Sequence, residues 1–271
     1  MAQIKKVLIT GCSTGIGRSA AQLFAERGWD VYALVRNIET AKDLVKKSIT
    51  LLCADVTDAR AIEDIFRKYA PFDVVVNNAG FGQMGPLEDV SEEELRYQFE
   101  VNVFAVHRII RLALPYMRNK RSGCIVNVGS VVGHLTFPLA GAYCASKHAL
   151  RSLTDALRIE VKSFGIRVVL IEPGPIQTSF GRTVVEKFAP DRSGAYCVWR
   201  KAVLKLIQKH RSQGASPQRV AKVILRCCES KIPFSRIVVT KRGWLMLMLK
   251  RQLPDVLWDR IFTTAAKLLS P

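Results

Sequence analysis

The chain has 271 residues, 49 % of them hydrophobic, and its formal net charge at pH 7 is +18. This hydrophobic content excludes an intrinsically disordered chain, and the length suits one large α/β domain. A strong excess of positive charge is typical of proteins that bind nucleic acids, anionic membranes or anionic small molecules.

Short apolar segments alternate with helical patterns along most of the chain. We expect strands at residues 6–10, 29–35, 49–53, 72–76, 123–129, 167–172 and 236–240. We expect helices at residues 18–27, 41–47, 59–69, 92–119 and 143–164, and a mostly helical stretch with several breaks at residues 178–216. Short β-branched strands separated by helices predict a parallel sheet that helices cover on both faces.

Residues 10–17 have the sequence TGCSTGIG and lie between the first expected strand and the first expected helix. Gly11 allows a tight turn, Gly15 lets the backbone approach a pyrophosphate, and Gly17 permits close packing of the helix on the strand. The N-terminus of the helix offers free N–H groups and a positive dipole end to phosphates. This context favours a dinucleotide-binding loop over a purely structural glycine-rich loop.

The end of the second expected strand selects between two dinucleotides. NAD sites usually place Asp or Glu there, where the carboxylate accepts a hydrogen bond from the ribose 2′-hydroxyl. This chain has Arg36 at the tip and no carboxylate, and a guanidinium suits a phosphate dianion. We therefore expect NADP(H) as the cofactor. NAD(H) is the alternative, because Arg36 could be a solvated loop residue and Glu39 is nearby.

Four sequence motifs follow one another in an order typical of one enzyme family. They are TGCSTGIG at residues 10–17, NNAG at 77–80, YCASK at 143–147 and PGPIQT at 173–178. Together they resemble the short-chain dehydrogenase/reductase family over residues 10–178. The resemblance implies a single doubly wound, Rossmann-type α/β domain of about seven parallel strands. It also implies a nicotinamide dinucleotide and the interconversion of carbonyls and alcohols.

Tyr143 and Lys147 are four residues apart, so a helix places them on one face. An unperturbed tyrosine, with a pKa near 10, is a poor base at neutral pH. A nearby ammonium and the positive ring of an oxidised nicotinamide favour the phenolate. We therefore expect Tyr143 to act as the general acid/base. By resemblance, Lys147 also binds the nicotinamide ribose. The alternative is an exposed tyrosine–lysine pair on a helix.

Two further polar residues match the family's catalytic positions. Ser130 follows the strand at residues 123–129, and by resemblance its hydroxyl steadies the substrate oxygen against Tyr143. Asn102 lies among apolar residues of the long expected helix, and a buried amide there needs a partner. By resemblance, Asn102 bonds main chain and holds a water in a proton relay to Lys147. A solvent-facing asparagine is the alternative.

By resemblance, further residues line the dinucleotide. Asp55 is expected near the adenine, with Val56 packing on it, and Ser13 is expected at the 2′-phosphate. Some NADP-preferring members carry a basic residue where this chain has Thr14, so the NADP prediction depends mainly on Arg36. The other expected contacts are Ile16 in the glycine turn, Asn78, Ala79 and Gly80 along the adenosine ribose, Pro173 and Gly174 around the nicotinamide, and Ile176 and Thr178 at its carboxamide.

The segment after the last motif is expected to cover the substrate. Residues 1–178 would form the cofactor-binding and catalytic core, and residues 179–216 a helical lid. The lid contains Phe180, Val184, Val185, Phe188, Tyr196, Trp199, Leu204 and Leu206. An apolar lid suits a lipophilic carbonyl or alcohol, and the chain resembles the subgroup of the family that handles steroids, retinoids and related lipids.

The positive charge is concentrated in the last third of the chain. Residues 1–181 carry 22 basic and 18 acidic side chains, whereas residues 182–271 carry 19 basic and 5 acidic ones. Residues 243–271 mix basic residues with apolar ones and tryptophan, so we expect a basic amphipathic C-terminal extension. Such a helix lies on a membrane surface. The alternatives, which do not exclude membrane contact, are packing over the substrate cleft or against another subunit.

Cysteine usage and the N-terminus bear on the compartment. The chain has seven cysteines, with no C-x-x-C pair and no His/Cys cluster of zinc spacing, so we expect reduced thiols and no metal site. The adjacent Cys227 and Cys228 are expected to pack on a helix. The first apolar run is too short for a signal peptide, and no apolar stretch has the roughly 18–20 residues that span a bilayer. We expect a cytoplasmic protein, with peripheral membrane contact at most.

The sequence thus predicts an NADP(H)-dependent oxidoreductase that interconverts a hydrophobic ketone or aldehyde and its alcohol. An alternative is a catalytically idle dinucleotide sensor that uses the fold for protein interaction. Only the net charge supports the hypothesis of nucleic-acid binding, and we expect no nucleic-acid partner. By resemblance, the long helices at residues 92–119 and 143–164 would form a homodimer or homotetramer.

Overall fold

A seven-stranded parallel sheet forms the centre of the protein, with the strand order β3-β2-β1-β4-β5-β6-β7. The computed structural model describes residues 4–45, 48–230 and 234–269. The strands are β1 (Lys6–Thr10), β2 (Asp30–Val35), β3 (Ile49–Cys53), β4 (Val74–Asn77), β5 (Gly123–Val128), β6 (Ile166–Glu172) and β7 (Arg236–Val238). The doubly wound sheet and the single α/β domain implied by the sequence are confirmed.

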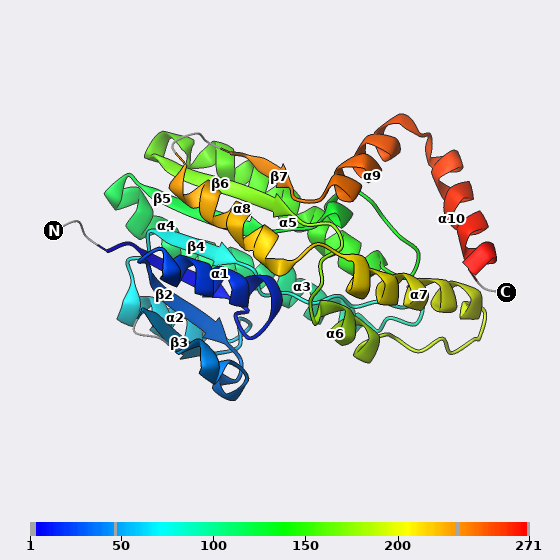
Figure 1. Ribbon diagram of the computed structural model, residues 1–271, viewed down its shortest axis with the longest axis horizontal. Helices are drawn as coiled ribbons and strands as arrows, with labels where there is room; N and C mark the ends of the chain where they lie inside the picture. The colour runs from blue at the N-terminus through cyan, green and yellow to red at the C-terminus, as the bar shows by residue number, and fades with distance from the viewer. Residues whose placement is uncertain (1–3, 46–47, 231–233, 270–271) are drawn as a thin grey trace.

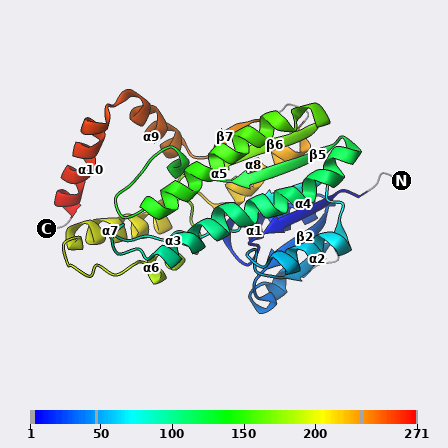
Figure 2. The ribbon, with the colours of Figure 1, turned by 180° about the vertical axis from the view of Figure 1, so that it is seen from behind.

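Helices cover both faces of this sheet (Figures 1 and 2). The α-helices are α1 (Gly15–Glu26), α2 (Ala59–Tyr69), α3 (Glu92–Phe99), α4 (Ala105–Lys120), α5 (Gly141–Glu160), α6 (Phe180–Glu186), α7 (Cys197–Gln213), α8 (Pro217–Glu229), α9 (Lys241–Gln252) and α10 (Asp255–Leu269). Shorter helical segments are η1 (Ile38–Leu44), η2 (Glu100–Phe104), η3 (Val131–Gly133) and η4 (Lys162–Phe164). Helices α1 and α8 lie on one face, and α2, α4 and α5 lie on the other.

The alternation of side chains along β1 explains why helices must cover both faces of the sheet. Successive side chains of a strand point to opposite sides. In β1, Val7 and Ile9 join the apolar cluster under α1 and α8, whereas Leu8 joins the cluster under α2, α4 and α5. The strand is therefore apolar at successive positions. Cys227 and Cys228 pack in the first cluster from α8, as expected.

The strand order reverses between β1 and β4, which are neighbours in the sheet. Loops leaving the carboxyl ends of these two strands diverge, and ligands of open α/β sheets bind in the crevice between them. The glycine turn follows β1 directly, and Asn78 follows β4. The topology therefore places two of the four motifs together at this crevice.

Three helical predictions need correction. The helix expected at residues 92–119 is interrupted by η2, a π-helical turn of five residues. The helix expected at 41–47 is instead the 3₁₀ segment η1 (Ile38–Leu44), which Asn37 caps by accepting a hydrogen bond from the N–H of Glu39; residues 46–47 lie outside the described part. Helix α8, which begins at Pro217 with Ser216 as its N-cap, was expected only at Cys227 and Cys228, and its full range was not predicted.

The expected C-terminal extension consists of two helices rather than one. Helix α9 ends at Gln252, Pro254 follows, and α10 begins at Asp255; residues 270–271 lie outside the described part. The basic and apolar residues of α9 do not segregate onto opposite faces, so this helix is not amphipathic. In both views the two helices project from the body at the end that carries α6 and α7 (Figures 1 and 2). Among the described residues, no helix has the length and apolar character needed to cross a membrane.

Candidate active site

The turn after β1 is shaped by close approaches that only glycine tolerates. Gly11 has a φ of +72°, and a Cβ there would lie 2.9 Å from Cα of Ala79. A Cβ on Gly17 would lie 2.3 Å from the carbonyl oxygen of Gly11. The first turn of α1 is therefore pressed against the loop that precedes it, and its N–H groups face the crevice.

The side chain of Asn78 holds this turn from the neighbouring strand. Its amide nitrogen donates to the carbonyl oxygens of Thr10 at 2.9 Å and Gly11 at 3.1 Å. In return, the Thr10 hydroxyl accepts from the backbone N–H groups of Asn78 and Ala79 at 3.0 and 2.9 Å. The expected contact of Asn78 with ribose remains a prediction, but its anchoring of the glycine turn is a structural role.

A cavity of about 510 Å³ opens beside the glycine turn. Its lining includes Thr14, Gly15 and Thr178, together with the two cations Arg18 and Arg182. A Cβ on Gly15 would lie 2.9 Å from Cγ2 of Thr178, so any added side chain would fill the passage between them. The glycine cradle, the helix N-terminus and the cations fit the pyrophosphate of a dinucleotide. The cavity lies at the glycine turn and not over Tyr143.

The tip of β2 presents Arg36 to solvent, directly after Val35. The carboxylate of Glu39 pairs with Lys42, so this candidate for an NAD-type acceptor is already engaged. Asp55, after β3, accepts hydrogen bonds at one carboxylate oxygen from the N–H and the hydroxyl of Thr57. Val56 beside it is buried, as a residue packing on an adenine would be.

Ser13 and Ile16 complete the predicted positions on the glycine turn. The backbone oxygen of Ser13 accepts a hydrogen bond from the Arg18 guanidinium at 3.3 Å, and Arg18 also pairs with Asp43. This brings a second cation to the position where the sequence expects a 2′-phosphate. Ile16 is half-buried and packs against the cluster under α1 and α8. It therefore anchors the helix start in the core.

Helix α5 carries Tyr143 and Lys147 on one buried face, with 8 % and 6 % of each residue exposed. The Lys147 ammonium donates to the carbonyl oxygen of Val128 at 2.9 Å and lies 5.9 Å from the centroid of the Tyr143 ring. Because burial disfavours the charged form, the pKa of Lys147 falls to about 8. The alternative of an exposed tyrosine–lysine pair is therefore excluded.

Burial also sets the protonation state of Tyr143. It raises the pKa of the phenol above its usual range, and a hydrogen bond with Ser130 offsets only part of that rise. The expected phenolate depended on Lys147 together with an oxidised nicotinamide. The protein's own residues favour the neutral phenol, which is the proton-donating form.

Ser130 lies at the end of β5, where η3 begins. Its side chain caps η3 by accepting from the N–H of Val132, and its hydroxyl lies 3.5 Å from the carbonyl oxygen of Pro173. The same carbonyl accepts from the N–H of Val131 at 3.1 Å. The Ser130 turn and the Pro173–Gly174 turn are thereby joined. A Cβ on Gly174 would lie 2.2 Å from the hydroxyl of Thr240, which explains the glycine there.

Asn102 is fully buried in the π-helical turn η2, so the alternative of a solvent-facing side chain is excluded. Its amide oxygen accepts from the N–H of Phe81, and its nitrogen donates to the carbonyl oxygen of Phe81 and to the hydroxyl of Ser146. A Cβ on Gly80 would lie 3.0 Å from Oδ1 of Asn102 and 3.7 Å from Nζ of Lys147. These two polar groups therefore converge on Gly80.

Three buried polar residues of the site were missing from the expected set. Thr10 holds the NNAG backbone, as described above. Ser146 accepts from Asn102 and donates to the carbonyl oxygen of Tyr143 at 2.7 Å. Gln98 accepts from the N–H of Gln83 at 2.6 Å and donates to the carbonyl oxygen of Phe81. Ser146 could have been predicted, because it lies inside the YCASK motif. Gln98 lies in no motif that would have indicated its role.

The lid begins at the last cofactor motif and folds over Tyr143. The hydroxyls of Thr14 and Ser179 lie 2.7 Å apart. The ring of Phe180 packs on the ring of Tyr143, with the centroids 5.4 Å apart. Ile176 forms a β-bridge with Ala215, which closes the lid as a loop. The structure thus brings the predicted catalytic, nicotinamide-side and lid residues to one end of the sheet.

Comparison with known proteins agrees with this geometry. Residues 5–188 match the family model described as short chain dehydrogenase. The chain therefore belongs to the short-chain dehydrogenase family, and it is an oxidoreductase of that type with a nicotinamide dinucleotide as cofactor. Among the described residues, no group of three or more His, Cys, Asp or Glu side chains could hold a metal ion.

Individual relatives match the chain over almost its whole length. The chain is 36 % identical to a 3-ketodihydrosphingosine reductase of Bacteroides thetaiotaomicron, covering 92 % of this chain and 93 % of the relative. It is 32 % identical to an NADPH-dependent 3-dehydrocapnine reductase of Ornithobacterium rhinotracheale, covering 98 % and 99 %. A crystal structure of a short-chain dehydrogenase from Streptomyces avermitilis superposes with a TM-score of 0.80 at 30 % identity, covering 96 % and 98 %.

Proposed function

We propose that the protein is an NADPH-dependent reductase of a lipophilic ketone or aldehyde, with Tyr143 as the general acid. One observation carries this proposal: the buried phenol of Tyr143 lies between the Ser130 turn, the Lys147 ammonium and the apolar lid residue Phe180. Each residue type needed at a carbonyl oxygen is present there, and the ring of Phe180 covers the ring of Tyr143.

The residues divide the chemistry among them. NADPH, when bound, supplies the hydride to the carbonyl carbon. Tyr143 donates its phenolic proton to the carbonyl oxygen, and the raised pKa of the phenol keeps that proton available at neutral pH. Ser130 donates a hydrogen bond to the same oxygen, and Lys147 binds the nicotinamide ribose. Asn102 fixes the Gly80–Phe81 backbone beside Lys147 and holds a water that returns a proton.

The preference for NADP(H) over NAD(H) is supported by charge at the tip of β2. Arg36 is exposed there, Arg18 lies against Ser13 and pairs with Asp43, and the carboxylate of Glu39 is paired with Lys42. A phosphate dianion would gain the exposed Arg36 guanidinium as a partner at this place. The relative from Ornithobacterium is NADPH-dependent by name.

The substrate class is supported by the lid and by the relatives. Phe180 and the buried Val184 face Gly82, where a Cβ would lie 3.1 and 3.2 Å from their side chains. This wall suits an alkyl chain rather than a sugar. The two relatives reduce 3-ketodihydrosphingosine and 3-dehydrocapnine by name. A long-chain ketone is therefore our first choice, and a steroid or a retinoid is the alternative.

We also propose that α9 and α10 contact an anionic membrane surface. Trp244, Leu245 and Leu249 on α9 are 55 %, 54 % and 49 % exposed, and Ile261 on α10 is 49 % exposed. Basic residues lie among them, which suits anionic lipid headgroups. The opposite side of α10 packs inward, where Phe262 lies on Trp258 and on Phe137. Packing and membrane contact can thus coexist.

A homodimer or homotetramer through α4 and α5 is the third part of the proposal. Apolar side chains are exposed on both elements and on η2 beside them: Phe104, Tyr116, Leu153 and Ile159, at 52, 42, 44 and 68 %. Exposed apolar groups of this size on neighbouring helices favour association. Size-exclusion chromatography with light scattering measures the assembly directly; a monomer at micromolar concentration would contradict it.

A substrate screen tests the proposed reaction. Purified protein is assayed with NADPH and NADH in parallel against ketones and aldehydes of increasing chain length, a steroid ketone and retinal. We expect turnover that favours NADPH and rises with chain length. Activity with NADH alone would contradict the assignment of Arg36, and activity confined to short polar carbonyls would contradict the assignment of the lid.

A further inference from the structure

Glu172 is a carboxylate with no exposed surface, and no sequence motif marks it. It is the last residue of β6 and directly precedes Pro173 and Gly174 of the nicotinamide-side turn. Burying a carboxylate costs several kcal/mol unless partners compensate. Its partners therefore show what the buried charge holds in place.

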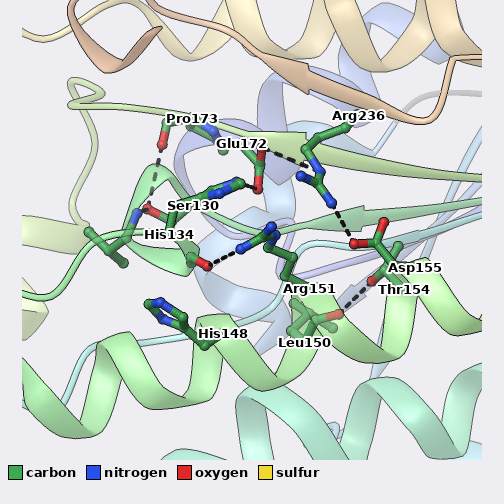
Figure 3. Close-up of polar contacts among 12 residues, drawn as sticks. Ser130, His134, His148, Leu150, Arg151, Thr154, Asp155, Glu172, Pro173 and Arg236 are labelled. Carbon is green, nitrogen blue, oxygen red and sulfur yellow. Dashed lines mark hydrogen bonds and ion pairs between the residues drawn. The ribbon is translucent and has the colours of Figure 1, made fainter. Parts of the chain in front are cut away.

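The first partner is His134, which directly follows the η3 turn that Ser130 caps. Nε2 of His134 lies 2.6 Å from Oε1 of Glu172, and the His134 side chain is 19 % exposed (Figure 3). The same turn is held at two other points: the N–H of Val131 donates to the carbonyl oxygen of Pro173, and Arg151 donates to the carbonyl oxygen of Gly133 at 3.3 Å.

The second partner is Arg236 of β7. Its Nε lies 3.9 Å from Oε2 of Glu172, and its guanidinium pairs with Asp155 of α5 (Figure 3). At this distance the contact is an ion pair and not a hydrogen bond, and neither Oε2 of Glu172 nor Nε of Arg236 has a hydrogen-bond partner in the described part of the chain. Glu172 thus joins the Ser130 turn on one side to the helix of Tyr143 and Lys147 on the other.

We propose that Glu172 and His134 are a positioning pair that holds the Ser130 turn in register with Tyr143. The pair acts through Ser130 and touches neither substrate nor cofactor. This inference rests on the proposed function, because it assigns a role within the same site. Its consequence is that loss of the pair costs the chemical step more than cofactor binding, because a displacement near 1 Å of a catalytic group can cost as much as 10²-fold.

A double-mutant cycle with Ser130 tests whether the pair acts through that residue. We expect Glu172→Gln to lower kcat about tenfold with whichever carbonyl the enzyme reduces, while the Kd for NADPH stays within about twofold. In a Ser130→Ala background the same substitution should lower kcat less than about twofold. Equal losses in both backgrounds would overturn the proposal, because they would mean that the pair does not act through Ser130.

Three further variants separate positioning from general stability. His134→Arg keeps a side-chain N–H donor beside Glu172 and should retain at least about half of kcat, whereas His134→Ala, a change at a partly exposed residue, should match Glu172→Gln. Asp64→Asn removes the carboxylate of an exposed pair with Arg67 and should leave kcat unchanged. A lowered melting temperature with unchanged kcat in His134→Ala would assign the pair a structural role only.

Hydrogen exchange decides the same point without turnover. In Glu172→Gln we expect faster amide exchange in a peptide that contains Val131 and Gly133, whose N–H groups are bonded in the wild-type turn, and unchanged exchange in α1. Unchanged exchange at both places would overturn the proposal. If the wild-type protein turned over no carbonyl, the proposed function would fail and this exchange measurement alone would decide.

Discussion

The first two thirds of the chain and the last third differ in charge balance and in the surroundings of their polar side chains. Before Thr178, the buried Asn102 and the half-buried Asn78 hydrogen-bond to backbone carbonyl oxygens of Phe81 and Thr10. Beyond Thr178, basic side chains greatly outnumber acidic ones, and large apolar side chains such as Trp244 and Leu249 are exposed. The predicted catalytic residues thus lie in the first region, and the second region adds exposed basic and apolar surface.

The largest effect that separates the two regions is expected at Tyr143. Tyr143→Phe removes the proton donor and keeps the ring that packs on Phe180. We expect kcat to fall about 10³-fold, because general acid catalysis contributes roughly 10²–10⁴-fold. NADPH binding, followed by its fluorescence, should be retained. A variant with more than about a tenth of wild-type kcat would contradict the assignment.

A buried ammonium in the core predicts a particular pH dependence of stability. The pKa of Lys147 is about 8 when folded and 10.5 in its usual range, so the unfolded chain binds more protons between these values. The free energy of unfolding of the wild type should therefore rise with pH between 8 and 10.5, relative to Lys147→Met, by up to about 3 kcal/mol. Below pH 8 Lys147 is protonated in both the folded and the unfolded state, so it adds no pH dependence to the free energy of unfolding.

Urea denaturation of both proteins across that range measures the difference. Lys222→Met, at an exposed lysine of α8, is the matched control: it keeps Lys147 and should show the same rise with pH as the wild type. A wild-type curve parallel to that of Lys147→Met would mean that the ammonium is not desolvated in the folded state.

Cofactor selection at the tip of β2 should show a smaller effect. Arg36→Asp exchanges a phosphate partner for an acceptor of the ribose 2′-hydroxyl. We expect the Kd for NADPH to rise about tenfold to 100-fold and the Kd for NADH to fall, because a charge-assisted hydrogen bond contributes about 1.5–3 kcal/mol. Titration calorimetry with both cofactors gives the two constants. An unchanged ratio would assign phosphate recognition to Arg18 instead.

The smallest effect is expected in the C-terminal helices, where it should leave catalysis intact. The double variant Trp244→Ser with Leu245→Ser should bind anionic vesicles about tenfold more weakly than the wild type, since two exposed apolar groups no longer insert. Turnover of a water-soluble carbonyl should not change. Ile38→Ser is the control, because Ile38 is an exposed apolar residue of η1, outside the C-terminal helices. Equal binding by all three proteins in a vesicle sedimentation assay would contradict membrane contact through α9.

Local sequence rules predict the regular parts of this fold well and its long-range connections poorly. Strands β1 and β3 and helix α2 coincide with the expected ranges, because apolar runs and helical periodicity are properties of neighbouring residues. The π-helical turn at Asn102 was missed, since it depends on hydrogen bonds to Phe81 some twenty residues earlier in the chain.

The site shows the same division. Tyr143, Lys147, Ser130 and Asn102 were expected from motifs, and the structure brings them together. Glu172 and His134 were not expected, because they are 38 residues apart in the sequence, one at the end of β6 and the other directly after η3. The C-terminal extension was expected as one amphipathic helix, whereas the break at Pro254 divides it into α9 and α10. Which side of these helices is buried depends on the lid, which periodicity alone does not reveal.

Transfer of deuterium from [4-²H]NADPH to a long-chain ketone tests the central claim most directly. The two stereoisomers of NADPH labelled at C4 are supplied in separate reactions, and the mass of the product alcohol is measured by mass spectrometry. The account predicts a product one mass unit heavier with one of the two isomers, and no labelled product from Tyr143→Phe over the same time. NADPH binding by the wild-type protein with no labelled alcohol from any ketone tested would contradict the account and would favour a dinucleotide sensor.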